Sequence, residues 1–307
     1  MTESKPESKP EHRAGYVALV GRPNVGKSTL MNALLDTRLA ITSKRPQTTR
    51  TRVTGILNGE GYQAVLVDTP GVVRPSDPLR KEMMRTAESV VRDADAVVYL
   101  VEAVGRGSAV SPIAIGWLRE SARPALLVLN KIDRLPRLQL LPMIDRLRDA
   151  NDWTEIVPIS ALKRDGIDRV IGAIERVLPE GPPLFLEGEL SEEPERFFAA
   201  EFVREQLMRQ LEQELPYAVA VEVERFERAE EGGRRLISAL IVVERESQKG
   251  IVVGKGGQMI KKIGTAARRS IESFLGEPLT LDLLVKVEKN WSTDPRRLAR
   301  FGYRGRG

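Results

Sequence analysis

The sequence contains no cysteine in its 307 residues. This absence excludes disulfide bonds, thiolate catalysis and zinc sites with cysteine ligands, and it suits a reducing compartment. The only histidine, His12, lies in a polar leader, so a catalytic triad or a metal site that needs histidine is not expected. Aromatic residues make up 5% of the chain, so a nucleic-acid surface could not depend mainly on bases stacked on aromatic rings.

Long hydrophobic runs are also missing. No apolar run approaches the roughly 18 residues of a membrane span, and the amino terminus has no apolar signal-peptide core. These absences favour a soluble protein, which we expect to be cytoplasmic. The chain is nevertheless 41% hydrophobic, which over this length is enough apolar sequence for two packed domains.

The net charge of +5 is small but unevenly distributed. Residues 190–248 carry 8 basic and 14 acidic side chains, a balance of −6, whereas residues 249–307 carry 13 basic and 5 acidic ones, a balance of +8. A basic carboxyl-terminal segment of this kind favours a surface that binds phosphates. Solvated helix faces followed by a basic tail would produce the same distribution.

Short apolar runs alternate with helix-like stretches in the first half of the chain. Continuous apolar runs are typical of strands covered on both faces, and their alternation with helices predicts βαβ units and a parallel sheet. Ligands bind at the carboxyl ends of such strands. The five predicted strands are 16–20, 63–68, 96–101, 125–130 and 156–160.

The second half of the chain has a different pattern. The stretch LPEGPPLFLEGELSEEPE (178–195) is rich in proline, glycine and acidic residues and predicts an interdomain linker. After it we expect a helix, two strands joined by a hairpin at Gly232-Gly233, and an alternating strand at 279–288. These elements indicate a small α+β domain. The leader, residues 1–14, repeats ESKP and is expected to be disordered.

The segment GRPNVGKS matches the GxxxxGK[ST] pattern of phosphate-binding P-loops, between a predicted strand and a predicted helix. Its two glycines let the backbone curl, so that N–H groups point toward phosphate oxygens at a helix N-terminus. Lys27 would reach the β- and γ-phosphates, and the hydroxyl of Ser28 would bind Mg²⁺. The predicted phosphate-binding residues are Gly21, Arg22, Pro23, Asn24, Val25, Gly26, Lys27, Ser28 and Thr29.

The sequence DTPG follows the second predicted strand. Asp68 would hold Mg²⁺ through water, and the N–H of Gly71 would face the γ-phosphate, with Thr69 and Pro70 completing the nucleotide-binding turn. GTPases of the Ras kind place a glutamine next, which orients the attacking water. This chain has Val72 there, so we expect slow intrinsic hydrolysis that a partner or ordering of a switch accelerates.

Two loops at the ends of the fourth and fifth predicted strands indicate guanine. In NKID, Asp133 could accept hydrogen bonds from two guanine N–H groups, a donor pair that adenine lacks, while Asn130 and Lys131 would fix the loop and flank the base. In SAL, a backbone N–H would meet the guanine carbonyl. The residues of this second loop are Ser160, Ala161 and Leu162.

The basic sequence RPQTTRTR (45–52) lies where a switch loop would close on the γ-phosphate and Mg²⁺. We predict that Thr49 joins the metal ion, with Thr48 as the alternative; a basic, solvated loop is the other interpretation. The predicted metal-binding residues are therefore Ser28, Thr49 and Asp68, and the predicted catalytic residues are Lys27, Thr49 and Gly71.

A second glycine-lysine loop, GKGG at 254–257, follows the apolar run GIVV and opens a predicted helix with lysines and arginines on its polar side. It lacks the GK[ST] ending, so it is not a nucleotide site. A loop of this kind resembles the clamp by which KH domains of the prokaryotic type hold about four nucleotides; a tight core turn is the alternative. The predicted RNA-binding residues are Ile251, Val252, Gly254, Lys255, Gly256, Gly257, Ile260, Lys261, Lys262 and Arg268.

Together the motifs GRPNVGKSTL, QTTR, DTPG, NKID, SAL and GKGGQMIKKIG resemble Era, a family of bacterial GTPases in small-ribosomal-subunit assembly. The resemblance implies an α/β P-loop GTPase domain with a mostly parallel sheet (15–180), a linker (181–195) and an α+β KH domain with a basic tail (196–307). It also implies GTP and GDP as ligands, and the 3′ end of small-subunit ribosomal RNA and the small ribosomal subunit as partners. Peripheral contact with the inner face of the cell membrane and activation by K⁺ at Asn24 are further implications, and we expect a monomer.

Three other functions are compatible with parts of the sequence. An RNA-binding protein could keep an inert nucleotide domain, but Lys27, Ser28 and Asp68 are intact. An ATP-dependent P-loop kinase would not need Asp133 or the SAL loop. A translation factor would need a longer chain that includes additional β-barrels.

The basic switch loop and the acidic segment 192–231 carry opposite charges, so we expect the nucleotide state to influence RNA binding.

Overall fold

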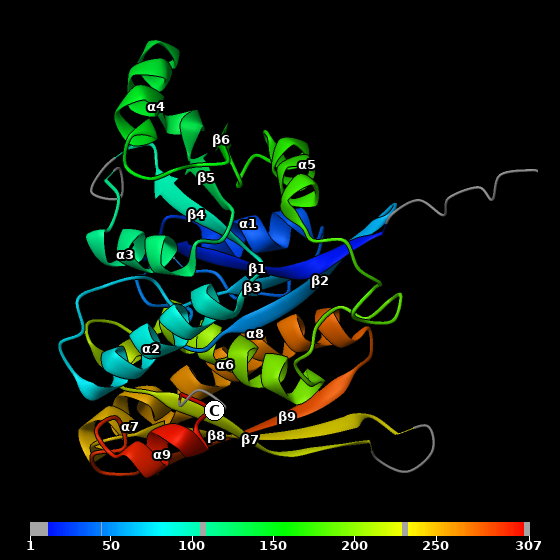
Figure 1. Ribbon diagram of the computed structural model, residues 1–307. Coiled ribbons are helices and arrows are strands. Elements are labelled where there is room, and N and C mark those ends of the chain that lie inside the picture. The colour runs from blue at the N-terminus through cyan, green and yellow to red at the C-terminus, as the bar shows by residue number, and fades with distance from the viewer. Residues whose placement is uncertain (1–11, 44, 105–108, 229–232, 304–307) are drawn as a thin grey trace, which may run out of the picture. The chain divides into compact units, whose positions relative to one another are not determined.

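The computed structural model describes residues 12–43, 45–104, 109–228 and 233–303 (Figure 1). Most of the predicted leader, part of the predicted hairpin turn and the last four residues of the basic tail lie outside the described residues. Among the helices that are described, none is long and apolar enough to cross a membrane.

A six-stranded sheet with strand order β2-β3-β1-β4-β5-β6 forms the core of the amino-terminal part. The pairs β1–β3, β1–β4, β4–β5 and β5–β6 are parallel, which confirms the parallel sheet predicted from the continuous apolar runs. The strands are β1 (Arg13–Gly21), β2 (Val53–Gly59), β3 (Tyr62–Asp68), β4 (Ala96–Glu102), β5 (Ala125–Asn130) and β6 (Glu155–Pro158).

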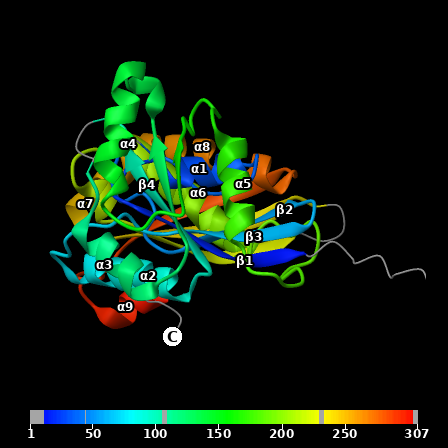
Figure 2. The same cartoon turned by 45° about the horizontal axis from the view of Figure 1, so that its top comes forward.

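Helices cover both faces of this sheet, as the predicted fold class requires. Helices α1 and α5 pack against each other on one face, and α3 lies on the other (Figures 1 and 2). The helices that follow these strands along the chain are α1 (Lys27–Leu34), α2 (Pro78–Asp93), α3 (Pro112–Ser121), α4 (Leu140–Arg148) and α5 (Ile167–Val177), with short 3-10 turns η2 (Ile132–Arg134) and η3 (Arg137–Gln139).

The segment predicted as a linker forms no helix or strand between residues 181 and 194, but it is hydrogen-bonded to the sheet. The side chain of Gln63 in β3 accepts hydrogen bonds from the N–H groups of Leu184 and Phe185. The N–H of Ile56 in β2 donates to the carbonyl of Leu190 over 3.0 Å. This part of the chain is therefore fixed against the β2–β3 edge.

A three-stranded sheet of order β7-β8-β9 forms the core of the carboxyl-terminal part. Strands β7 and β8 are antiparallel, and β8 and β9 are parallel. The elements are α6 (Glu195–Gln210), η4 (Leu215–Tyr217), β7 (Ala220–Arg228), β8 (Arg235–Val243), α7 (Glu246–Val253), η5 (Lys255–Gly257), α8 (Gln258–Leu275), β9 (Leu279–Val287) and α9 (Pro295–Arg300).

The two faces of this sheet are covered differently. Strand β9 alternates as predicted, and a Cβ added to Gly264 of α8 would lie 3.3 Å from Leu283, so this face of β9 packs on α8. On the opposite face, the carboxyl-terminal segment covers part of β7 and β8, whereas the side chains that β9 presents there, such as Leu284, are exposed. We call the buried residues of that contact the tail cluster: Ala220, Leu240, Val242, Trp291, Leu298 and Tyr303.

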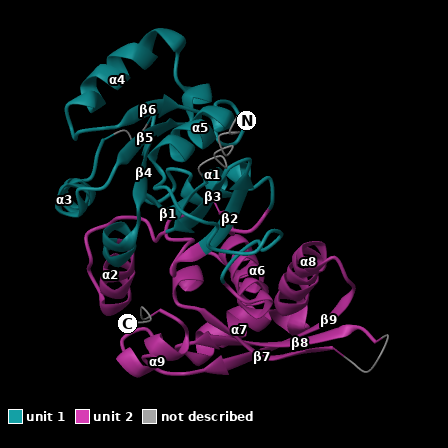
Figure 3. Cartoon of the chain, turned by 45° about the vertical axis from the view of Figure 1, so that its right-hand side comes forward, with its two compact units in different colours: residues 1–37, 54–68, 88–192 teal, residues 38–53, 69–87, 193–307 magenta. Residues whose placement is uncertain are grey.

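Contacts divide the chain into two compact units, coloured separately in Figure 3. Unit 1 comprises residues 1–37, 54–68 and 88–192, and unit 2 comprises residues 38–53, 69–87 and 193–307. The predicted domain boundaries at residues 180 and 196 stay a prediction, but this division by contacts assigns 38–53 and 69–87 to the unit of the second sheet. The reason is that these segments bond to residues of α6, η4 and the tail cluster.

Candidate nucleotide-binding and nucleic-acid-binding sites

The predicted P-loop connects β1 to α1 in unit 1. Gly26 stands immediately before α1 with a φ of 105°, a left-handed conformation that favours glycine. A Cβ at this position would lie only 2.2 Å from Nδ2 of Asn130. Glycine is therefore required here both by the backbone and by the space that Asn130 occupies.

Lys27 is buried at the start of α1, where its Nζ donates to the carbonyls of Gly21 (3.3 Å) and Arg22 (3.4 Å). Burial lowers the pKa of Lys27, and the nearby carboxylate of Asp68 opposes this shift. The next residue, Ser28, donates from Oγ to Oδ2 of Asp68 over 2.6 Å. The structure thus brings together a lysine, a hydroxyl and a carboxylate at the carboxyl ends of β1 and β3, as predicted.

Asn130 connects three loops through one buried amide. Its Nδ2 donates to the carbonyl of Val25 in the P-loop over 2.8 Å. Its Oδ1 accepts hydrogen bonds from the N–H groups of Lys131 (2.8 Å) and Ala161 (3.0 Å). The P-loop, the NKID loop and the SAL loop are therefore held in one arrangement by a single side chain at the end of β5.

Lys131 ties the same loops together from the outside. It has a positive φ of 67°, and its Nζ donates to the carbonyl of Asn24 over 2.6 Å and pairs with Glu102 at 3.1 Å. Glu102 was not among the residues predicted from the sequence. It is a carboxylate at the carboxyl end of β4, where the rule for parallel sheets places ligand-site residues.

Asp133 lies exposed in η2 and accepts a hydrogen bond from Oγ of Ser160 over 2.6 Å. This hydrogen bond is the main cause that lowers the pKa of Asp133, with Lys163 and Arg134 adding to the effect. The carboxylate is therefore ionised at neutral pH, with oxygen lone pairs still available to a donor. Leu162 of the SAL loop is also largely exposed.

The predicted switch residues belong to unit 2. Thr48 and Thr49 are both buried, and Oγ1 of Thr48 donates to the carbonyl of Arg45 over 2.9 Å. This hydrogen bond closes a local turn, and the choice between Thr49 and Thr48 as a metal ligand stays a prediction. Gly71 and Val72 are also buried.

The GKGG loop forms η5 between α7 and α8. Gly254, Gly256 and Gly257 all have positive φ angles, between 57° and 77°. A Cβ on Gly254 would lie 2.7 Å from Met259, whereas a Cβ on Gly256 or Gly257 would meet nothing within 4 Å. One face of the loop is thus packed on α8, and the other is open to a ligand.

Basic residues follow the loop on the exposed side of α8, as predicted. Lys255, Lys261, Lys262 and Arg268 are all exposed. The predicted apolar contacts are altered, because GIVV ends helix α7 rather than forming an extended run.

The helical conformation separates two of the residues predicted to contact bases. Ile251 is 55% exposed, but Val252 on the other side of α7 is 0% exposed and belongs to the core. The side chain of Val252 is therefore not accessible to a base in this structure. Ile260 is partly buried.

Comparison with known protein families agrees with this geometry. Residues 16–131 match the model of the family "50S ribosome-binding GTPase", and residues 214–292 match that of the KH domain. The chain is 45% identical to GTPase Era of Geobacter metallireducens over 291 residues, which cover 95% of this chain and 98% of the relative. It is 44% identical to GTPase Era of Stenotrophomonas maltophilia over 305 residues, which cover 99% of this chain and all of the relative.

Two solved structures share the fold over nearly the full length. One is a crystal structure of Era in complex with MgGDPNP and nucleotides 1506–1542 of 16S ribosomal RNA; it is 38% identical with a TM-score of 0.90, and the match covers 96% of this chain and all of that chain. The other is Aquifex aeolicus Era bound to GDP·AlF4⁻, also 38% identical with a TM-score of 0.90, covering 95% of this chain and all of that chain. The chain therefore belongs to the Era family of GTPases.

Proposed function

We propose that this chain is a GTP-hydrolysing switch that binds the single-stranded 3′ end of small-subunit ribosomal RNA and acts in assembly of the small ribosomal subunit. The observation that carries the nucleotide half is the Asn130 amide, which holds the P-loop, the NKID loop and the SAL loop together. The RNA half is supported by the open side of the GKGG loop and by the Era structure that contains nucleotides 1506–1542 of 16S ribosomal RNA.

In this proposal the base and the phosphates are read by different loops. The ionised carboxylate of Asp133 accepts two hydrogen bonds from guanine, and a backbone N–H of the SAL loop donates to the guanine carbonyl. The backbone of the P-loop and Lys27 bind the β- and γ-phosphates. The N–H of Gly71 would face the γ-phosphate, which stays a prediction from the sequence.

The residues present suit Mg²⁺ as the metal ion. Within the described residues, no three His, Cys, Asp or Glu side chains form a group that could hold a metal, so the ion would need phosphate oxygens as well. The hydroxyl of Ser28 and the carboxylate of Asp68, 2.6 Å apart, are the hard oxygen donors that Mg²⁺ prefers. With Thr49 they would hold the ion, which when bound neutralises charge on the phosphates.

The purified protein is expected to hydrolyse GTP slowly. Val72 is buried and apolar where a Ras-type enzyme has a glutamine, so no side chain at this position can orient water. We expect an intrinsic rate on the order of 10⁻⁴ to 10⁻² s⁻¹, measured as phosphate release at saturating GTP. A rate of several per second for the protein alone would contradict slow intrinsic hydrolysis.

Repeating the assay with Na⁺ in place of K⁺ tests the proposed activation by K⁺ at Asn24.

Replacing Lys27 with alanine is expected to weaken GTP binding by about 3 kcal/mol, or on the order of 100-fold, because charge-assisted bonds to two phosphates are lost. Fluorescent-GTP titration measures the effect. The RNA affinity of the full chain, measured without nucleotide, should stay unchanged, as should the GTP affinity of the matched exposed-lysine variant Lys289→Ala. Equal losses of GTP and RNA binding would indicate misfolding of Lys27→Ala instead of a lost phosphate contact.

The RNA partner can be identified in cells. Crosslinking of the chain to RNA, followed by sequencing of the bound fragments, should recover the 3′ end of small-subunit ribosomal RNA. Fragments spread evenly over cellular RNA would contradict this target.

We also propose peripheral membrane contact, on the family resemblance alone. Sedimentation with anionic vesicles tests this contact, and absence of co-sedimentation would contradict it.

A further inference from the structure

The segment that carries Thr48 and Thr49 is attached to the KH-containing unit at both of its ends. We call its described residues, 38–43 and 45–50, the switch segment. All of the contacts described below lie within unit 2. They connect the segment to α6, to the turn after it and to the tail cluster.

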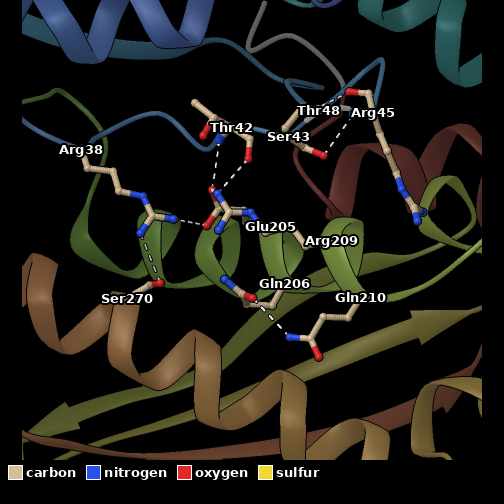
Figure 4. A network of polar contacts seen from close by, with 10 residues as sticks. All are labelled: Arg38, Thr42, Ser43, Arg45, Thr48, Glu205, Gln206, Arg209, Gln210 and Ser270. Atoms are coloured by element: carbon tan, nitrogen blue, oxygen red, sulfur yellow. Dashed lines mark hydrogen bonds and ion pairs between the residues drawn. The ribbon is translucent and has the colours of Figure 1, made fainter. Parts of the chain in front are cut away.

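The first attachment is centred on Glu205 of α6, which is 0% exposed. Its carboxylate accepts a hydrogen bond from the N–H of Thr42 over 3.1 Å and forms ion pairs with Arg38 and Arg209 (Figure 4). Arg209 also donates to the carbonyl of Thr42 over 3.2 Å. A buried carboxylate needs such partners, so this end of the segment has a defined position on α6.

The second attachment is Arg50, which is 2% exposed. Its guanidinium donates to the carbonyls of Val219 (2.7 Å), Pro216 (2.9 Å) and Tyr217 (3.1 Å), and to the hydroxyl of Tyr303 (3.3 Å). Its Cζ also lies 5.8 Å from the centre of the Tyr303 ring. One planar cation thus joins the turn between α6 and β7 to the carboxyl-terminal segment, a geometry that lysine cannot reproduce.

The two attachments differ in their separation from Thr49 along the chain. Arg50 is its direct neighbour, and adjacent Cα atoms are fixed about 3.8 Å apart. Thr42 is seven residues away, a length of chain that can span up to roughly 24 Å. A displacement of Thr49 toward a bound nucleotide would therefore move Arg50, whereas the intervening turn could absorb it before Thr42.

The groups that Arg50 contacts are connected to the GKGG loop through packed elements of unit 2. The turn 216–219 precedes Ala220 of β7, which belongs to the tail cluster with Tyr303. Before the turn, α6 packs on α8, with the rings of Phe202 and Phe274 5.5 Å apart. Helix α8 begins directly after the GKGG loop.

The segment that contains Gly71, which is predicted to face the γ-phosphate, reaches the same place. Leu79, in the 69–87 segment that follows Asp68, packs against the tail cluster. Arg45, Arg50 and Arg80 all lie near enough to Tyr217 to oppose the rise in its pKa that burial causes. Both segments predicted to respond to the γ-phosphate therefore converge on the turn 216–219 and the tail cluster.

We propose that Arg50 is the positioning residue through which a nucleotide-dependent displacement of Thr49 changes the affinity of the GKGG loop for RNA. This inference rests on the proposed function. It assigns the coupling to one attachment of the switch segment, the clamp on residues 216–219, and not to the buried carboxylate of Glu205.

The test measures RNA affinity of the full chain with GDP and with a non-hydrolysable GTP analogue. Couplings of this kind typically amount to 5- to 150-fold, and we expect the wild-type ratio in this range. Arg50→Ala should bring the ratio to within about twofold, with GTP and RNA each still bound. Arg50→Lys, which keeps the charge but not the planar fork, should give an intermediate ratio; if Arg50→Ala does not fold, this variant decides. The matched control Arg38→Ala, at the other attachment, should keep the wild-type ratio.

Hydrogen exchange of peptides covering residues 214–222, with RNA absent, gives a second readout. In the wild type, exchange should differ between GDP and the analogue, and in Arg50→Ala this difference should vanish. A wild-type affinity ratio in Arg50→Lys or Arg50→Ala, or a ratio of one in the wild type, would overturn the inference. Failure of the wild type to bind GTP or RNA at all would instead overturn the proposed function.

Discussion

Asp133→Asn is expected to transfer the preference of the chain from guanosine to xanthosine nucleotides. The asparagine side chain cannot accept hydrogen bonds from both guanine N–H groups, because its amide presents donors where one carboxylate oxygen stood. We expect GTP affinity to fall by about 3–5 kcal/mol, or roughly 10² to 10⁴-fold. Xanthine has a carbonyl in place of the exocyclic amine, so the new NH₂ group gains a partner there.

Competition titrations with GTP, XTP and ATP against a fluorescent nucleotide measure this change. The local structure should survive, since the asparagine oxygen can still accept the hydrogen bond that Ser160 donates to Asp133. Asp165→Asn is a matched control, because it makes the same substitution on the loop that follows β6, at an exposed side chain that faces Arg169. Unchanged GTP affinity in Asp133→Asn would show that this residue does not read the base.

The parts of the site that could be predicted from the sequence are those built from consecutive residues. The P-loop, NKID and SAL loops each have fixed spacing, and each follows an apolar run that forms a strand of the six-stranded sheet. Parallel strands bring such loops to one edge whatever lies between them in the sequence. This explains why the sequence alone places Asn130, Asp133 and Ser160 at one site. In the structure the loops that carry them are hydrogen-bonded to one another, whereas their roles in nucleotide binding stay a prediction.

The parts that could not be predicted depend on contacts between residues far apart in the sequence. Strand β2 contains two glycines and an asparagine, which are depleted in strands, and it forms because β3 offers it an edge. The run GIVV has strand-like composition but closes helix α7, whose first turn is capped through Gln248. The bond between Arg50 and the carbonyls of residues 216–219 spans more than 160 positions, and backbone carbonyls carry no sequence signal.

The largest expected effect on RNA binding comes from replacing Lys255 and Gly256 of the GKGG loop with aspartates. Both residues are exposed, and a Cβ on Gly256 would meet nothing within 4 Å. Aspartate tolerates the left-handed φ of 57° at this position better than most residues, so the loop should keep its shape. A strand of RNA would, however, meet two carboxylates and additional side-chain volume where its phosphodiester backbone approaches the loop.

We expect this double variant to lose RNA affinity by on the order of 100-fold or more at about 0.1 M salt, while phosphate release from GTP without RNA stays at the wild-type rate. The control must separate local contact from net charge. Lys81→Asp combined with Gly61→Asp makes the same two substitutions elsewhere, at an exposed lysine and at a glycine with a φ of 76° and open space around it. Loss of affinity in both double variants would indicate a diffuse electrostatic effect, whereas unchanged affinity in the loop variant would contradict a KH-type clamp at residues 254–257. Only loss confined to the loop variant fits RNA held by backbone approach at GKGG, because the two proteins carry the same net charge.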